Sequence, residues 1–361
     1  MIKAEIVADS INEKGNRITS FIVTFPRIIL AEKNTHRVFS RNSASSRAIP
    51  FPKMVKSVRE NPFIPIAWQK DHKGMQGTEY FSKEEKFEIS IFIQALDKIF
   101  KGDEELIKLF TDIFEGWKGV EKTLDEWWLV ARDYALESSI LLSCFGVTKQ
   151  LCNRLLEPFM WHTILVTSTE WENFFALRCP KYSIIDRVEN NNPIYRYVRS
   201  KKDYIKDHIN NEGTIGQVSF PLDSWLRLNQ GQAEIHMMAL AEAIYDSYNE
   251  SKPELLKEGE YHIPFKDRIQ LNNLGFLVTE QEIETALKIS TVMGARTSYT
   301  VVGEDQKPMT YKRMCELHDE MLEAKPVHAS PFEHCALNMN NNEKSRNFIG
   351  GWKQYRDLLN I

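Results

Sequence analysis

The chain of 361 residues lacks the features that mark several large classes of protein. Its 5 cysteines are odd in number and form no C-x-x-C pair, which argues against a disulfide framework and a cysteine-built zinc site. No apolar run approaches the ~20 residues that cross a bilayer, and the N-terminus lacks the apolar core of a signal peptide. The net charge of -4 gives no bulk attraction to nucleic acid or to an anionic membrane. We therefore expect a cytoplasmic protein in which any anion site is local.

The phosphate-binding signatures of the common nucleotide folds are also missing, since there is neither a G-x-G-x-x-G fingerprint nor a P-loop. What is present is a globular composition, with 42% hydrophobic and 27% charged residues. The residue patterns predict an α+β fold with a large helical part. The expected elements are a strand pair at 2–9 and 17–30, an irregular segment at 49–78, helices within 82–178, a mixed insertion at 179–229, and helices at 232–248, 280–293 and 308–324.

The stretch from Glu32 to Phe51 concentrates polar side chains. Positions 36–47 hold three arginines, a histidine, four serines and an asparagine, with little beyond Val38 and Phe39 to bury. Guanidinium forks and small hydroxyl donors together suit an anion of fixed geometry, above all a phosphate. A solvated loop without a ligand is the alternative that the same composition allows. Serine hydrolysis is not expected, because no nucleophile elbow accompanies the serines.

A second polar cluster, H-A-S-P-F-E-H-C at 328–335, offers two histidines, a glutamate and a cysteine as metal ligands. Their spacing does not place them on one helical face, Pro331 interrupts any helix, and the H-E-x-x-H order is absent. A turn in which His328 or Ser330 caps a following helix explains the cluster more simply, and a ligand contact without metal is the other alternative. We therefore predict no metal site.

Arg178 stands at the end of a helix predicted at 167–178, for which Thr167 and Glu170 have the spacing of a capping box. An arginine in this position commonly favours the helix dipole and packs its stem on apolar neighbours. The functional alternative is a positive charge directed into a site.

The segment T-H-R-V-F-S-R-N-S-A-S-S-R resembles the signature of the flavin-dependent thymidylate synthases, R-H-R-x-x-S-x-N-E-x-S-x-R. Six of the eight fixed positions match at the family's spacing. Thr35 replaces the first arginine, and Ser43 replaces the glutamate. The matching residues are His36, Arg37, Ser40, Asn42, Ser45 and Arg47.

Two C-terminal elements extend the resemblance. A-R-T-S-Y at 295–299 and H-A-S-P-F-E-H at 328–334 are similar to the family's A-R-x-S-[FY] and H-x-[ST]-P-F-E-H. In most members these elements precede the signature, whereas here they follow it. The order therefore looks circularly permuted, as in a phage-encoded branch, and permutation is tolerated where termini lie close together at the surface.

Three shorter elements from the middle of the chain also resemble the family. N-F-F-A-L-R at 173–178 is similar to N-F-x-x-L-R, and Q-A-E-I at 232–235 is similar to Q-x-E-I. Arg154 followed by Pro158 resembles R-x-x-L-P, with Glu157 in place of the leucine.

The resemblance implies one catalytic domain over 1–361, built on a central mixed or antiparallel sheet, with insertions at about 60–140 and 179–229. It implies C5-methylation of dUMP to dTMP with 5,10-methylenetetrahydrofolate as carbon donor, FAD as redox cofactor and NADPH as reductant. It also implies a homotetramer with active sites shared between subunits, and no partner among nucleic acids or membranes. The family needs no cysteine nucleophile, and the sequence has no distinctive cysteine motif.

The resemblance further assigns individual roles. Arg178 would face the pyrimidine as the catalytic residue, because a fixed guanidinium stabilises negative charge as C5 becomes nucleophilic. The residues implied to bind dUMP are Glu32 (a glutamine in the family), Ser45, Ser46, Arg47, Arg154 and Arg178, and those implied to bind FAD are His36, Arg37, Asn173, Ser298, His328 and Ser330.

The two departures from the signature leave alternatives open. Thr35 removes a cation from the FAD set, and Ser43 removes a carboxylate from between nucleotide and flavin. A related enzyme that adds water in place of hydride, and so hydroxymethylates dUMP, is one alternative. A flavin-free protein that holds nucleotides or nucleic acid by their phosphates is another, although the acidic net charge argues against nucleic acid.

Overall fold

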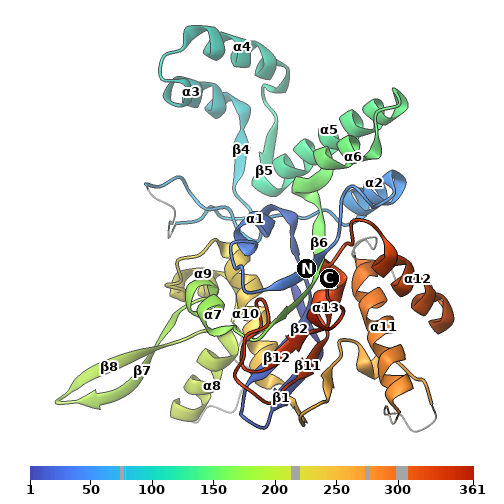
Figure 1. The fold of residues 1–361 in the computed structure, drawn as a ribbon. Coiled ribbons are helices and arrows are strands. Elements are labelled where there is room, and N and C mark those ends of the chain that lie inside the picture. Colours follow the sequence, from blue (N-terminus) through green and yellow to red (C-terminus); the bar gives the residue numbers. More distant parts are fainter. Residues whose placement is uncertain (74–76, 78, 213–219, 273–276, 278, 298–307) are drawn as a thin grey trace.

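A five-stranded sheet forms the centre of the protein (Figure 1). The structure is a computed structural model that describes residues 1–73, 77, 79–212, 220–272, 277, 279–297 and 308–361. The strand order is β3-β6-β2-β1-β9, and every neighbouring pair is antiparallel except β1 with β9. The expected mixed sheet in an α+β fold is therefore confirmed. The strands are β1 (Lys3–Asn12), β2 (Arg17–Pro26), β3 (Ser40–Ser43), β6 (Trp161–Ser168) and β9 (Glu254–Leu256).

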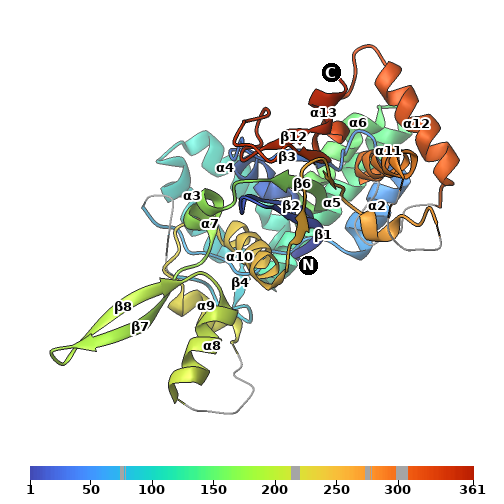
Figure 2. The same ribbon diagram turned by 60° about the horizontal axis from the view of Figure 1, so that its bottom comes forward.

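Both faces of this sheet are covered, because successive side chains of a strand point to opposite sides (Figure 2). On one face, Phe21 and Val166 pack against α10 (Ile235–Glu250) and α7 (Glu172–Arg178). On the other face, Leu165 lies against α11 (Glu280–Arg296), where a Cβ on Gly294 would come within 2.9 Å of the leucine side chain. Because both faces are covered, almost every residue of β2 and β6 is buried, the polar ones included.

The C-terminal part packs as a second layer with its own core around Ile289 and Phe332. It includes a three-stranded sheet in the order β10-β11-β12. The helices predicted at 280–293 and 308–324 are confirmed in α11 and α12. The elements are β10 (Tyr261–His262), α12 (Tyr311–Glu323), the 3-10 helix η6 (Ser330–Glu333), β11 (Ala336–Asn338), β12 (Trp352–Gln354) and α13 (Tyr355–Leu358).

Two segments project from this body, and both lie in the ranges expected to be insertions (Figure 1). A strand pair carries a helical hairpin on one side, and a β-hairpin followed by two helices extends on the other. The first segment comprises β4 (Lys86–Glu88), α3 (Ile89–Phe100), α4 (Glu104–Phe114), η2 (Glu115–Trp117) and β5 (Glu121–Thr123), and the second comprises β7 (Tyr182–Glu189), β8 (Asn192–Val198), α8 (Lys201–Glu212) and α9 (Leu222–Leu228).

The prediction of a helix over 167–178 is partly wrong. Strand β6 continues to Ser168, and α7 begins only at Glu172, although it ends at Arg178 as expected. The Thr167 hydroxyl caps no helix, since it lies 2.6 Å from Ser20 Oγ and 2.9 Å from His334 Nδ1. Pairing with β2 and β3 outweighs the local capping pattern.

The prediction of irregular structure at 49–78 is also partly wrong, because α2 spans Phe51–Glu60. Its two prolines, Pro50 and Pro52, fall at the N-terminal end, where a missing N–H costs no helical hydrogen bond. Likewise, the strand expected over 17–30 ends at Pro26. The remaining elements are η1 (Arg27–Ile29), α1 (Leu30–Lys33), α5 (Leu124–Cys144), α6 (Lys149–Cys152), η3 (Asn153–Phe159) and η4 (Lys266–Arg268).

Candidate functional site

Asn42, on strand β3 of the signature stretch, joins three segments that are far apart in the sequence. Its Nδ2 donates to the Gly294 carbonyl oxygen at 2.5 Å and to Thr297 Oγ1 at 3.2 Å. Its Oδ1 accepts from Ser330 Oγ at 3.0 Å. Because the side chain is buried, these bonds replace those that water would have made. The signature and the two C-terminal motifs therefore meet at one amide.

Arg178, the last residue of α7, reaches back to the start of the same stretch. Its Nε donates to His36 Nε2 at 3.0 Å, and its Nη2 lies 3.4 Å from Thr35 Oγ1. The His36 ring stacks near Phe39 and meets the edge of Phe174, with centroids 5.8 and 4.9 Å away. This aromatic packing fixes the imidazole, and the imidazole in turn orients the guanidinium.

His36 is neutral in this arrangement. Burial, together with the charges of Arg178, Lys33 and Arg41, lowers its pKa to about 4. The geometry agrees, because Nε2 can accept from Arg178 only when it carries no proton. The imidazole therefore serves as a fixed acceptor at neutral pH and does not act as a cation.

The carboxyl group of Glu32 interacts with the Arg178 guanidinium and with a second carboxylate, that of Glu234. Burial raises the pKa of Glu32, the negative charge of Glu234 raises it further, and Arg178 opposes the shift. Glu32 Oε2 is buried and has no hydrogen-bond partner among the described residues. Glu234 is fixed by its role as the N-cap of α10, where it accepts from the backbone N–H groups of His236 and Met237. The Q-A-E-I element thus borders the site at Glu234.

A separate group of donors converges on Glu157. Its Oε1 accepts from Ser46 Oγ at 2.5 Å and from Arg27 Nη2 at 3.4 Å, and it lies 3.9 Å from Arg154 Nη1. Two residues that the resemblance assigns to dUMP, Ser46 and Arg154, are therefore brought together with an arginine that the sequence did not single out. A hydroxyl and two guanidiniums around one anionic oxygen make an anion-binding arrangement.

Four of the predicted site residues are exposed, and their side chains make no hydrogen bond or ion pair with another residue of the described part of the chain. They are Arg37, Arg47, Asn173 and His328. Ser45 contributes its carbonyl oxygen to the turn that follows it, where it accepts from the N–H groups of Ala48 and Ile49. Ser298 lies outside the described residues.

The two departures from the signature have defined surroundings. The Thr35 hydroxyl donates to the Glu32 carbonyl oxygen at 2.6 Å. Ser43 Oγ lies 2.7 Å from His162 Nε2, which is also 3.3 Å from Arg27 Nη1. Ser43 is therefore connected through His162 to the donors around Glu157.

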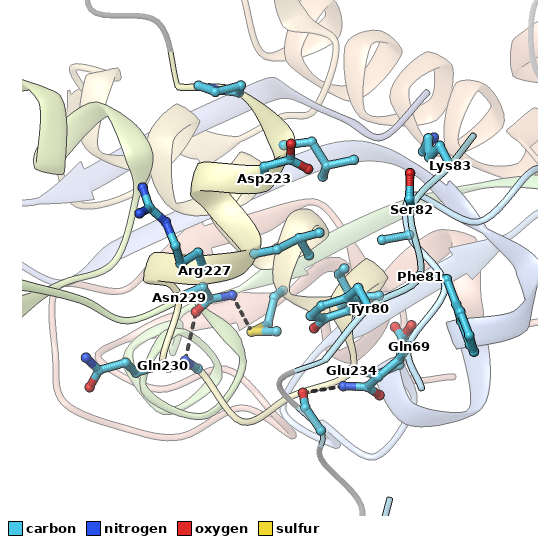
Figure 3. Close-up of a pocket in the computed structure, with 18 of the residues that line it drawn as sticks. Gln69, Tyr80, Phe81, Ser82, Lys83, Asp223, Arg227, Asn229, Gln230 and Glu234 are labelled. Carbon is cyan, nitrogen blue, oxygen red and sulfur yellow. Dashed lines mark hydrogen bonds between the residues drawn. The ribbon is translucent and has the colours of Figure 1, made fainter. Parts of the chain in front are cut away.

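A cavity of about 1090 Å³ lies beside the site, between the segment 67–84 and the segment 221–238 (Figure 3). Glu234 and Gln69 lie toward one end of it, and Asp223 and Lys83 toward the other. None of the residues predicted to hold dUMP or FAD lines this cavity. Glu234 connects the two regions, because it lines the cavity and also influences the pKa of Glu32.

Sequence reasoning missed three residues of the site: Arg27, Lys33 and Glu234. Arg27 directly follows Pro26, the last residue of β2. Its position at the end of a strand was the feature of the sequence that could have identified it. Lys33 is fully buried, its Nζ has no hydrogen-bond partner among the described residues, and burial places its pKa well below the usual value. Glu234 lay within the Q-A-E-I element without an assigned role.

The H-A-S-P-F-E-H segment forms the 3-10 helix η6, which has Ala329 at its N-cap and no side-chain cap. The expected capping role of His328 or Ser330 is therefore wrong, because the Ser330 hydroxyl binds Asn42 instead. Among the described residues, no group of three or more His, Cys, Asp or Glu side chains is arranged to hold a metal ion. No helix in the described ranges has the length and apolar character needed to cross a membrane.

No family model, curated protein or solved structure matches the chain.

Proposed function

We propose that the protein is a flavin-dependent thymidylate synthase. It methylates C5 of dUMP to give dTMP, with methylenetetrahydrofolate as the carbon donor, FAD as the redox cofactor and NADPH as the reductant. The observation that carries the proposal is the meeting of Asn42 with Gly294, Thr297 and Ser330. These residues belong to or adjoin three motifs that resemble one family, and they lie more than 250 positions from Asn42 in the chain.

Arg178 supports the proposal through its fixed orientation. Two of its N–H groups are directed to His36 and Thr35, and the guanidinium has five in all, so donors remain for a pyrimidine carbonyl. A donor held before the reaction costs no reorganisation when negative charge develops on the base. The neutral His36 adds no second positive charge and acts as the positioning residue.

The residues assigned to FAD fit an anionic cofactor in part. Arg37, Asn173 and His328 are exposed, and their side chains have no hydrogen-bond or ion-pair partner in the described part of the chain. Their polar groups are therefore available to the flavin nucleotide. His36 and Ser330 are already engaged with Arg178 and Asn42, and we assign them to positioning. When bound, FAD supplies the redox chemistry, and the protein supplies binding and orientation. A homotetramer with shared active sites remains part of the proposal.

The first experiment is flavin binding by the purified protein. Protein incubated with FAD and freed of unbound cofactor should absorb at roughly 450 nm, a property of oxidised flavin. Arg37→Ala should bind less FAD, whereas Arg268→Ala, which changes an exposed ion pair with Glu5, should bind as much as the wild type. A protein that takes up no FAD would rule out the proposed reaction, and a stable monomer in gel filtration would rule out the tetramer.

A further inference from the structure

The carboxylate of Glu157 lies where Ser46, Arg27 and Arg154 could otherwise bind an external anion. The 3-10 helix η3 carries both Arg154 and Glu157, and Asn153 at its start holds it against the signature stretch. Asn153 Nδ2 donates to the carbonyl oxygens of Ser46 at 2.6 Å and Ile49 at 3.0 Å. Two of the donors, Ser46 and Arg154, are therefore positioned by contacts that do not involve the Glu157 side chain.

The charge around this carboxylate is unbalanced. Arg27 and Arg154 both lie within 4 Å of Glu157, so two cations face one anion. Arg47 follows Ser46 directly and has no ion pair among the described residues. The Nζ of Lys149 lies 3.2 Å from the Ala48 carbonyl oxygen on the same turn. This excess of positive charge favours a second anion or a more highly charged one.

A carboxylate and a phosphate draw on the same donors, since both accept charge-assisted bonds from guanidinium and hydroxyl groups. A phosphate dianion can use more of these donors and carries more charge than a carboxylate. Glu157 is 20% exposed, so its side chain has a path to solvent when it leaves the donors. An uncharged hydroxymethyl group, as on a nucleoside, provides no comparable gain for displacing it.

We propose that Glu157 is an internal competitor that occupies the phosphate subsite until a phosphate-bearing ligand displaces it. The carboxylate lowers the affinity for every anion that needs these donors by the free energy of its own contacts, and it leaves the affinity for unphosphorylated ligands, which do not need them, unchanged. The identity of the ligand as dUMP rests on the proposed function, whereas the competition at the anion subsite does not.

The test is titration calorimetry at constant ionic strength with inorganic phosphate, dUMP and deoxyuridine. Glu157→Gln keeps the shape of the side chain without its charge, and Glu157→Leu removes the competing oxygens. Glu137→Gln makes the same charge change at an exposed position of α5 and serves as the control. Circular dichroism establishes that each variant is folded, and the near-isosteric Glu157→Gln decides the outcome if Glu157→Leu does not fold.

Both Glu157 variants should bind phosphate and dUMP about tenfold more tightly than the wild type, because the subsite no longer has to be vacated. Deoxyuridine binding and the control should be unchanged. Unchanged or weaker phosphate binding in folded Glu157→Gln would overturn the inference, because Glu157 would then only position its neighbours. Tighter phosphate binding with no added affinity for dUMP would retain this inference and reject the proposed function.

Discussion

The guanidinium of Arg178 donates from Nε to Nε2 of a neutral His36 at 3.0 Å. This bond connects the end of α7 with the start of the signature stretch, 142 positions away. Since His36 is fixed by Phe39 and Phe174, the arginine is held by the core on one side and free for a ligand on the other. The orientation of Arg178 is the part of the site on which the proposed chemistry depends most.

Replacement of Arg178 by alanine should reduce turnover of dUMP by at least about 100-fold, the usual cost of losing one preorganised donor to a developing negative charge. Bound FAD should remain, because Arg178 is not assigned to the flavin. Steady-state kinetics and flavin absorbance measure the two effects, with Arg268→Ala as the control. Turnover retained in Arg178→Ala would show that its assigned role is wrong.

Replacement of Asn42 by alanine should lower the free energy of unfolding by about 2–3 kcal/mol, because buried groups of Gly294 and Ser330 lose their partner. Urea unfolding measures the change. Asn249→Ala removes an exposed amide that bonds within α10 and should change stability by less than about 0.5 kcal/mol. Equal effects of the two substitutions would show that the bonds from Asn42 to Gly294 and Ser330 do not stabilise the fold.

Stability should fall as the pH falls from about 6.5 toward 4. The pKa of His36 is lowered from 6.5 to about 4, so in this window the unfolded chain binds a proton that the folded chain does not. Burial lowers the pKa of His162, His262 and His334 to about 3, which acts in the same direction. His36→Gln should show a shallower dependence in urea unfolding at several pH values, whereas the exposed His328→Gln should follow the wild type. An identical slope in all three proteins would contradict the neutral state of His36.

Glu32→Gln should stabilise the protein at neutral pH. The pKa of Glu32 is raised from 4.5, so the folded chain holds its proton more tightly and loses stability as the pH rises through that value. Glutamine removes the repulsion with Glu234 and keeps the shape, so its advantage should appear above about pH 4.5 and vanish in acid. Glu258→Gln, at an exposed turn, is the control, and a Glu32→Gln protein less stable than the wild type at pH 7 would refute the electrostatic account.

Periodicity predicted the parts of the fold that local pattern controls. The strand pair β1–β2 and the helices α10, α11 and α12 lie where expected. Strand β6 could not be predicted in this way, because a strand buried on both faces shows no alternation of apolar and polar residues, and β6 lies in a range that otherwise has helical spacing. Helix α2 was obscured by prolines that are harmless in its first turn.

The sequence identified many residues of the candidate site, but it did not predict which of them contact one another. Motif resemblance selected Asn42, Ser330 and Arg178, but their partners are set by the packing of three segments. The sequence marked Glu157 only as a departure from the family, and its contacts with Ser46 and Arg27 depend on the seating of η3 against the signature stretch. Long-range side-chain contacts of this kind have no local signal.

The most direct measurement is mass spectrometry of dUMP after incubation with the protein, FAD, NADPH and methylenetetrahydrofolate. The account predicts dTMP, formed only when FAD is present and formed at least about 100-fold more slowly by Arg178→Ala. A hydroxymethylated product would place the protein in the related reaction. Unchanged dUMP with the FAD-loaded wild-type protein would contradict the account.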